Sequence, residues 1–283
     1  MQKKRSFVLA LMFALTFALV ACGSSGGGGS ANGGGDGGTD GEGGGQGDQN
    51  LELVKSGKFT FASSGAFPPF SKVNESGEME GYDIAVGKAI AEKLGLEPNP
   101  KKYKFGGIIA GIVSGRFDAA VASHTITEKR DKKVDFSQPY YYSGPQIFTQ
   151  PGSDLQTLED LTGKEIAVSK GSTYYPMAQK VTDNIHTYAS DLTALRALAK
   201  GKHDAVITDI ITGKKAIAHG LKVVGKDTLG VSKQAVAVAE GNEALLKAIN
   251  KALTELKEEG TLAELGKKWI GSDISQPPEK AKE

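Results

Sequence analysis

The chain is nearly without cysteine, because only Cys22 occurs among its 283 residues. A single cysteine cannot form an internal disulfide, so no disulfide framework holds this fold together. The sequence also lacks an excess of charge, since 34 lysines and arginines balance 33 aspartates and glutamates. This near-balance argues against nucleic acid as a partner.

Local motifs for metals and phosphates are missing as well. The four histidines and the one cysteine are scattered along the chain without the spacing of metal ligands. No glycine-rich phosphate loop ending in Gly-Lys-Ser or Gly-Lys-Thr is present. We therefore expect no metal and no other cofactor.

Long hydrophobic runs are confined to the N-terminus. A basic start, residues 3–5, precedes an apolar stretch that ends at Ala21 and Cys22. Its length and charge are typical of an export signal rather than of a membrane span, so residues 1–22 are predicted to be a signal peptide. Residues 23–50 are mostly glycine, and such a composition predicts a flexible linker with a span of roughly 30 Å.

The remaining body, residues 51–283, contains one phrase twice. Residues 113–123 and 199–209 each run from an apolar helical pattern through Gly and a basic residue to an Asp-Ala pair that opens an apolar strand. Glycine ends a helix because it accepts a left-handed backbone without a Cβ penalty. The short apolar run that follows is typical of a buried parallel strand. Two copies predict two similar α/β lobes.

The order of the predicted elements places two crossings between the lobes, near 143–147 and 231–236. Two crossings make the first lobe discontinuous and the second an insert, which is how a hinge is built. The predicted boundaries are 51–143 and 234–274 for lobe 1, 144–233 for lobe 2 and 275–283 for a polar tail. Ligands bind beyond the carboxyl ends of strands in such sheets, so Ser123 and Asp209 are the first candidates for a shared cleft.

Nine short stretches of the body match, in the same order, motifs that occur together in one known protein family. They are 66–70, 81–86, 125–130, 135–140, 161–164, 170–173, 201–209, 260–262 and 268–269. Each stretch is weak alone, but on their order and spacing the body resembles the solute-binding proteins of bacterial polar amino-acid ABC importers. The resemblance implies a periplasmic-binding-protein-like fold, with two α/β lobes joined by a two-segment hinge. It also implies a monomer that binds a free amino acid without chemistry on it and hands it to a membrane permease.

The end of the signal segment carries a second resemblance. Residues 19–22, Leu-Val-Ala-Cys, resemble the lipobox of bacterial lipoproteins. This implies lipidation of Cys22 and an extracytoplasmic protein anchored to the cell membrane through the linker. The alternative is an ordinary signal peptide that happens to contain a cysteine.

A free amino acid needs a cation for its carboxylate, and arginine suits this task because its fork meets both oxygens. By resemblance Arg130 is that residue, with Thr125 and Ser123 beside it. Thr173, at a predicted helix start where free N–H groups favour an anion, is expected to reinforce the grip from lobe 2. The alternatives are a solvated charge for Arg130 and a plain helix cap for Thr173.

The ammonium group needs an acid, and Asp209 is the candidate because it ends a buried strand where an unpaired carboxylate is costly. Its alternative role is the N-cap of the following helix. Phe67 and Phe105 match family positions that stack on the ligand side chain, although ordinary core packing is the alternative. Ser64 stands where family members for cationic amino acids tend to carry an acid, which disfavours lysine or arginine. Ser169 is a further candidate for side-chain choice.

Three functions remain open at this stage. The first is import of a polar uncharged amino acid, with cystine as the candidate because 140–144 and 171–175 resemble cystine-binding relatives. The second is an amino-acid sensor lipoprotein, which the tether permits. The third is an enzyme similar to cyclohexadienyl dehydratase on the same scaffold. The enzyme is disfavoured because no surplus carboxylate accompanies Arg130.

Overall fold

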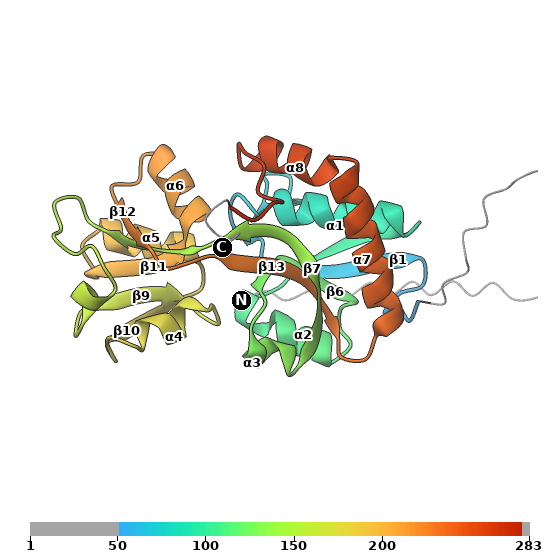
Figure 1. Ribbon diagram of the computed structural model, residues 1–283, viewed down its shortest axis with the longest axis horizontal. Coiled ribbons are helices and arrows are strands. Elements are labelled where there is room, and N and C mark those ends of the chain that lie inside the picture. The colour runs from blue at the N-terminus through green and yellow to red at the C-terminus, as the bar shows by residue number, and fades with distance from the viewer. Residues whose placement is uncertain (1–50, 279–283) are drawn as a thin grey trace, which may run out of the picture. The chain divides into compact units, whose positions relative to one another are not determined.

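The structure is a computed structural model that describes residues 51–278. The predicted signal segment, Cys22, the linker and residues 279–283 lie outside the described residues. Within 51–278, no helix has both the length and the apolar character that a membrane crossing requires. The described chain builds two five-stranded sheets and one small sheet of three strands (Figure 1).

The first sheet has the strand order β5-β1-β6-β13-β7. Its strands are β1 Lys58–Ser63, β5 Glu97–Lys102, β6 Ala119–Thr125, β7 Val134–Ser143 and β13 Ser232–Ala239. Strand β1 pairs in parallel with β5 and β6, whereas β13 is antiparallel to β6 and β7. We call the part of the chain built on this sheet lobe 1.

The second sheet, the basis of lobe 2, repeats this layout with the order β10-β9-β11-β8-β12. Its strands are β8 Pro145–Thr149, β9 Ile166–Ser169, β10 Ile185–Tyr188, β11 Ala205–Asp209 and β12 Val224–Thr228. Strand β9 pairs in parallel with β10 and β11, and β8 is antiparallel to β11 and β12. The two copies of the repeated phrase therefore occupy corresponding strands, β6 and β11.

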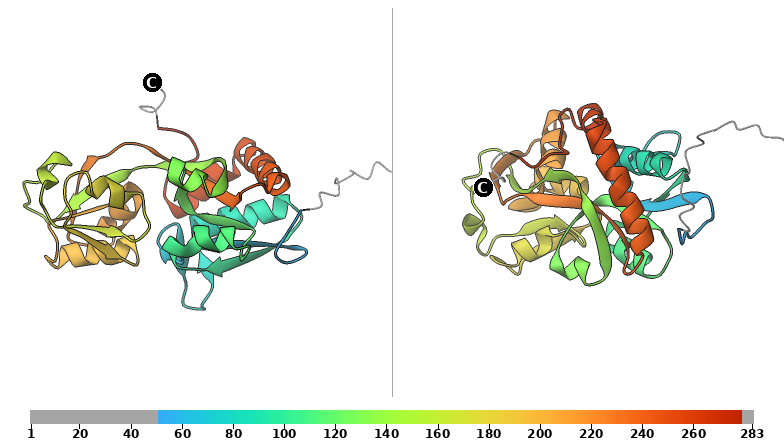
Figure 2. Two further views of the ribbon diagram at one scale, coloured as in Figure 1. Left: turned by 90° about the horizontal axis from the view of Figure 1, so that it is seen from below. Right: turned by 45° about the vertical axis from the view of Figure 1, so that its right-hand side comes forward.

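Helices cover both faces of each sheet (Figures 1 and 2). In lobe 1 they are α1 Tyr82–Lys93, α2 Ile108–Val113, α3 Glu128–Asp131, α7 Glu243–Glu258 and α8 Thr261–Trp269. In lobe 2 they are α4 Tyr174–Ala178, α5 Asp191–Ala199 and α6 Ile210–Ala218. The small sheet consists of β2 Ala66–Phe67, β3 Ser71–Val73 and β4 Met79–Glu80.

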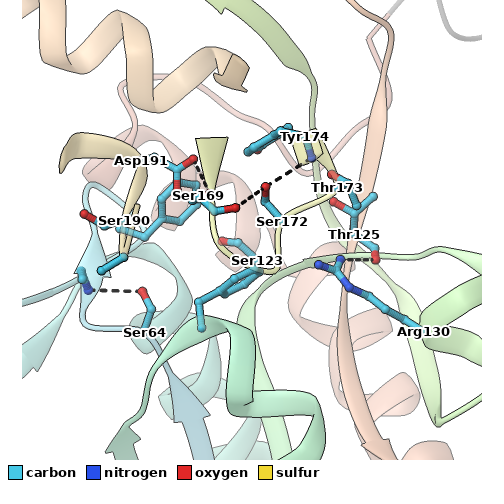
Figure 3. Close-up of a pocket in the computed structure, with 14 residues that line it drawn as sticks. Ser64, Ser123, Thr125, Arg130, Ser169, Ser172, Thr173, Tyr174, Ser190 and Asp191 are labelled. Atoms are coloured by element: carbon cyan, nitrogen blue, oxygen red, sulfur yellow. Dashed lines mark hydrogen bonds between the residues drawn. The ribbon is translucent and has the colours of Figure 1, made fainter. Parts of the chain in front are cut away.

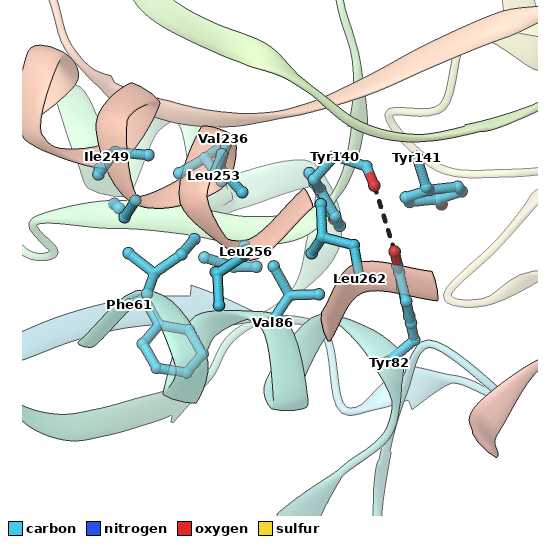
Figure 4. Close-up of a cluster of buried hydrophobic side chains, with 14 of the residues drawn as sticks. Phe61, Tyr82, Val86, Tyr140, Tyr141, Val236, Ile249, Leu253, Leu256 and Leu262 are labelled. Atoms are coloured by element: carbon cyan, nitrogen blue, oxygen red, sulfur yellow. Dashed lines mark hydrogen bonds between the residues drawn. The ribbon is translucent and has the colours of Figure 1, made fainter. Parts of the chain in front are cut away.

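The core of lobe 1 follows from alternation along its strands. Successive side chains of β1 point to opposite faces, so Phe61 packs among the residues of α1 and α7 while Ala62 faces α2. Figure 4 shows Phe61 and Val86 opposite Leu253 and Leu256, all of them buried. Burying each such side chain stabilises the fold by about 1.5–3 kcal/mol. This core holds in place the residues at the ends of the lobe 1 strands.

The lobes are joined where two strands leave one sheet for the other. Strand β7 ends at Ser143 and β8 begins at Pro145, while Ser232 of β13 pairs with Ser143. The two linking segments touch, because a Cβ on Gly144 would lie 2.2 Å from the carbonyl oxygen of Gly230. Only glycine fits at position 144 without moving that backbone.

Some predicted elements differ from the structure. The sequence of residues 155–161 predicts a short helix, but only a 3₁₀ turn at Glu159–Leu161 forms. The sequence of residues 221–224 predicts a strand, and the strand in the structure lies at Val224–Thr228. Strands β5 and β10 were not predicted, since both lie at sheet edges and β5 contains two prolines, which edge strands tolerate.

Candidate functional site

A pocket lies between the lobes and takes seven residues from each. Lobe 1 contributes Ser64, Ala66, Phe67, Phe105, Ser123, Thr125 and Arg130; lobe 2 contributes Ser169, Ser172, Thr173, Tyr174, Ala189, Ser190 and Asp191. Eight of the nine residues predicted to bind the ligand are in this lining, and Asp209 is not. The lining holds one cation and one acid, which Figure 3 shows on opposite sides of the group.

Arg130 is positioned by the short helix α3. Thr127 caps this helix, because its Oγ1 accepts a hydrogen bond from the Arg130 backbone N–H at 3.3 Å. The guanidinium donates from Nη1 to the Thr125 carbonyl at 2.8 Å and lies 5.8 Å from the centre of the Phe105 ring. Burial lowers the pKa of Arg130 to about 10. The side chain therefore remains a cation at neutral pH.

The two lobes meet at the rim of the pocket. Arg130 Nη2 of lobe 1 donates to the Gly171 carbonyl of lobe 2 at 3.1 Å. Gly171 has a φ of +82°, and a Cβ there would lie 2.8 Å from the Gly106 Cα atom. The left-handed backbone and the close approach both require glycine at this position. The carbonyl that meets Arg130 depends on that approach.

Ser123 sits at the end of β6 in an unusual backbone conformation. Its φ is 56°, the left-handed region that non-glycine residues rarely adopt. Its N–H donates to the Tyr140 hydroxyl at 2.9 Å, and its Oγ donates to Asp83 Oδ2 at 2.8 Å. The Tyr140 hydroxyl in turn donates to Asp83 Oδ1 at 2.6 Å. Burial raises the pKa of Asp83 to about 7, and the two hydrogen bonds only partly offset this.

Asp191 is the acid of the lining, and it is not among the residues predicted from the sequence. It is the first residue of α5, which Ser190 caps by accepting the Thr193 N–H at 3.3 Å. Asp191 Oδ1 accepts hydrogen bonds from Ser169 Oγ at 2.9 Å and Thr208 Oγ1 at 2.5 Å. Burial raises the pKa of this carboxyl. The signal for it was the Ser-Asp pair before an apolar helical run, a typical helix start, which says nothing of a cleft.

Asp209 lies at the predicted strand end but outside the lining. Its Oδ1 accepts the backbone N–H groups of Ile211 at 2.8 Å and Thr212 at 3.1 Å, and its Oδ2 accepts from Ser143 Oγ at 2.5 Å. The helix-cap role weighed from the sequence is therefore present. Burial, with a smaller contribution from the nearby charge of Asp191, raises the pKa of Asp209 to about 6. Its role as partner of the ammonium stays a prediction.

Aromatic rings form the lobe 1 wall. Phe67 stacks on Phe70 with ring centres 4.9 Å apart, and Phe105 stacks on His124 at 4.6 Å. His124 is buried, its Nδ1 has no partner within residues 51–278, and burial lowers its pKa well below the usual value. The Phe105 ring therefore contacts a neutral imidazole and also lies near the Arg130 guanidinium.

The hydroxyls of the lining come from both lobes. Ser64 Oγ shares a hydrogen bond of 3.0 Å with Ser71 Oγ, and Ser172 Oγ donates to the Ser169 carbonyl at 2.7 Å. Thr173 precedes α4 but makes no side-chain cap bond, unlike the plain cap considered from the sequence. The lining contains neither histidine nor cysteine, so it offers no nitrogen or sulfur ligand for a metal.

Comparison with known proteins places this pocket in context. The family described as bacterial extracellular solute-binding proteins, family 3, matches residues 59–272. The L-cystine-binding protein TcyJ of Escherichia coli K12 is 34% identical over 236 residues, covering 80% of this chain and 87% of that protein. The L-cystine-binding protein TcyA of Bacillus subtilis is 28% identical over 282 residues, covering 96% and 100%. An ancestral arginine-binding protein, solved with bound glutamine, has a TM-score of 0.72 and 36% identity, covering 77% and 100%.

Proposed function

Because the chain belongs to the bacterial extracellular solute-binding proteins of family 3, we propose that it captures a free polar amino acid outside the cytoplasm and delivers it to an ABC importer. The observation that carries this proposal is the charge arrangement of the pocket. One cation, Arg130, comes from lobe 1, and one acid, Asp191, comes from lobe 2. A zwitterion whose side chain has no net charge matches that pair without adding a net charge to the pocket.

In the proposed complex the ligand carboxylate meets the Arg130 fork. Thr125 and Ser123 support it from lobe 1, and Thr173 supports it from lobe 2. To bind this way, the carboxylate replaces the Gly171 carbonyl as the partner of Nη2, so the ligand takes over a bond that now joins the two lobes. A hydrogen bond from the guanidinium to a carboxylate is stronger than the bond to a neutral carbonyl that it replaces.

The ammonium then lies against Asp191. Asp209, which is outside the pocket lining, provides a second negative charge. Both carboxyls have raised pKa values because they are buried, and an ammonium would stabilise their ionised forms. The ligand therefore binds acids that are costly to bury alone. Burial on closure strengthens both charge pairs, because the effective dielectric constant falls as water leaves.

Binding of this kind calls for motion of one lobe relative to the other. The two touching segments at Gly144 and Gly230 are the proposed hinge. We propose that the ligand meets the Arg130 lobe first and then draws lobe 2 over it. A closed complex is the form that a membrane permease would distinguish from the empty protein, because only closure brings both lobes to one ligand.

Cystine is the first candidate ligand. TcyJ and TcyA bind it, and its far half is a second zwitterion whose two charges cancel. The wall formed by Ser64, Ser169 and Phe67 carries hydroxyls and an aromatic face, which suit a net-neutral polar group, but no acid to pair a side chain that is only cationic. Asp191, the only acid of the lining, is taken by the α-ammonium in this scheme. Glutamine is the alternative within the same class, since an ancestral relative binds it.

The remaining predictions extend this proposal. Lipidation of Cys22 would hold the protein at the cell membrane, and the linker would leave the lobes free to turn as a monomer. We propose no chemistry on the ligand, because the acid of the lining is engaged in binding. An amino-acid sensor would use the same pocket, and loss of ligand uptake on deletion of the protein separates import from sensing.

A thermal-shift screen of the common amino acids plus cystine tests the proposal. At about 100 times its dissociation constant, a ligand adds about 2.7 kcal/mol of stability, which raises the melting temperature of a protein this size by roughly 5–11 °C. We expect such a shift for cystine or another neutral polar amino acid and none for lysine or arginine. A screen without any shift would overturn the proposed function. Mass spectrometry of the released ligand should return it unchanged.

A further inference from the structure

Three side chains with metal-binding atoms converge at the other end of the lobe 2 sheet. Glu165 directly precedes β9, His186 is the second residue of β10, and His203 lies just before β11. One ligand atom from each of the three lies within 4.8 Å of the others. Glu165 Oε1 is 2.7 Å from His203 Nδ1 and 3.1 Å from His186 Nε2. The two imidazole rings are 4.9 Å apart.

The cluster has one anchored ligand and two adjustable ones. The side chain of His203 is 4% exposed, whereas those of Glu165 and His186 are 34% and 51% exposed. A buried imidazole with a fixed direction defines a site, and exposed partners can adjust to an ion. The exposed side also gives an ion a path from solvent.

The far side of the His203 ring is held by a second partner. Its Nε2 lies 2.6 Å from the Tyr188 hydroxyl, and the two rings meet edge to face at 5.4 Å. Nδ1 lies 2.7 Å from Glu165 Oε1, and a carboxylate oxygen accepts, so in this contact Nδ1 carries the ring proton and Nε2 accepts from the Tyr188 hydroxyl. A cation at Nδ1 requires the other tautomer, in which Nε2–H donates to that hydroxyl and the Nδ1 lone pair is free for the ion. Histidines that bind metals almost always donate their other N–H in this way, because the bond fixes the ring and its tautomer.

Lobe 1 shows that the fold does not need these polar groups. In the first copy of the repeated phrase, Phe117 occupies the place of His203, and it packs edge to face on Tyr103 at 5.4 Å. The aromatic contact is thus common to both lobes. Only in lobe 2 is one of the two rings an imidazole, and only there do a carboxylate and a second imidazole lie next to it.

We propose that Glu165, His186 and His203 bind one divalent cation of the kind that prefers imidazole, such as Zn²⁺. Tetrahedral zinc with bonds of about 2.0–2.1 Å keeps neighbouring ligand atoms about 3.3 Å apart. The Glu165 oxygen therefore has to move back from His203 Nδ1 by about half an ångström, and the two histidine nitrogens have to take up the same spacing. The fourth position is open to water or to an atom of another molecule. Sequence spacing predicted no metal site, because the three ligands are brought together only by the pairing of β9 with β10 and β11.

This site is separate from the amino-acid pocket. The pocket takes Ser169 from the carboxyl end of β9, whereas Glu165 precedes the amino end of the same strand. Zinc binding therefore does not require the proposed function, and failure of one leaves the other standing. We expect amino-acid affinity to be the same with and without a metal chelator.

Titration of the full chain with Zn²⁺ tests the proposal, in competition with a chromophoric chelator and without a polyhistidine tag. Every sample carries Cys22→Ser, so that the lone thiol does not compete. We expect one zinc ion per chain. His186→Ala and Glu165→Gln should each weaken binding tenfold or more, and Tyr188→Phe about tenfold through loss of the bond to His203. Mg²⁺, which prefers oxygen ligands, should not compete.

His219→Ala is the matched control, because it removes another exposed histidine of lobe 2 outside the cluster. It should bind zinc as the parent does. Melting curves in chelator verify that each variant is folded. The proposal is overturned if the parent binds no stoichiometric zinc, if His186→Ala binds as tightly as the parent, or if His219→Ala loses as much affinity as His186→Ala.

Discussion

The two lobes share one strand order but use their buried acids differently. Each lobe buries a carboxylate near the carboxyl ends of its parallel strands, and each carboxylate accepts two hydroxyl hydrogen bonds. In lobe 1, Asp83 is bonded by Ser123 and Tyr140 and does not line the pocket. In lobe 2, Asp191 is bonded by Ser169 and lines it. Lobe 1 thus keeps its acid sealed away from the pocket, to which it contributes the cation Arg130.

This difference explains why the site needs both lobes. A lobe that carried both charges would pair them with each other and leave little for a ligand. With Arg130 on one lobe and Asp191 on the other, each charge is buried without a partner of opposite sign among the lining residues of its own lobe. In the proposed complex the ligand supplies the missing charges, so its presence favours the closed arrangement.

The largest expected effect is the loss of the lobe 1 cation. Arg130→Ala leaves the ligand carboxylate buried without a charged partner, which should weaken binding by roughly 2–5 kcal/mol. Calorimetric titration with the amino acid that the screen identifies measures this. Arg116→Ala, which removes an exposed arginine of the same lobe, should bind as the parent does. Affinity of Arg130→Ala within threefold of the parent would contradict the proposed site.

Exchanging the residues at the repeated aromatic contact tests how alike the lobes are. Phe117→His replaces a phenyl ring by a smaller, polar one in the apolar cluster of Ile108, Ile112 and Ala237, and should cost roughly 3 kcal/mol of unfolding free energy. The reverse change, His203→Phe, keeps the contact with Tyr188 and should cost about 1 kcal/mol or less. Urea denaturation compares the two variants. Equal costs would mean that the polar partners of His203 stabilise the fold as much as the apolar core does.

The roles of the two buried acids of lobe 2, Asp191 and Asp209, can be distinguished by replacing each of them with asparagine. Asp191→Asn keeps the side-chain shape but removes the charge that faces the pocket, so binding should weaken by roughly 2 kcal/mol, about thirtyfold. Asp209→Asn should weaken binding by about 1 kcal/mol or less, because Asn caps a helix as well as Asp does and residue 209 does not line the pocket. Calorimetry on both variants decides. A larger loss for Asp209→Asn would restore the acid first predicted from the sequence.

The sequence predicted the helices and strands of the two lobes better than it predicted which side chains these elements bring together. The repeated phrase identified β6 and β11, because a helix, a glycine and a buried strand each leave a local signal. The edge strand β10 left none, and without it the position of Asp191 after that strand could not be seen. Arg130 was found by resemblance, whereas the cluster of Glu165, His186 and His203 depends on strand pairing that no local spacing reveals.

The smallest expected effect is the pH dependence of the unfolding free energy that comes from Asp83, the buried acid of lobe 1. Burial raises the pKa of Asp83 to about 7, whereas an unfolded aspartate titrates near 3.9. Between pH 6 and pH 8 the unfolded carboxyl is already ionised while the folded one loses its proton. The folded state binds more protons, so the unfolding free energy falls as pH rises, by about 1.4 kcal/mol for this group.

Asp83→Asn should remove that fall, because asparagine does not titrate. Urea denaturation of the parent and the variant at pH 6 and pH 8 measures it, and the advantage of the parent should shrink by that amount at the higher pH. Other titrating groups are common to both proteins and cancel in the difference. The same advantage at both values would mean that folded Asp83 does not change its ionisation between pH 6 and pH 8. Ligand affinity at pH 8 should change only a few-fold, because the carboxylate that lines the pocket belongs to the other lobe.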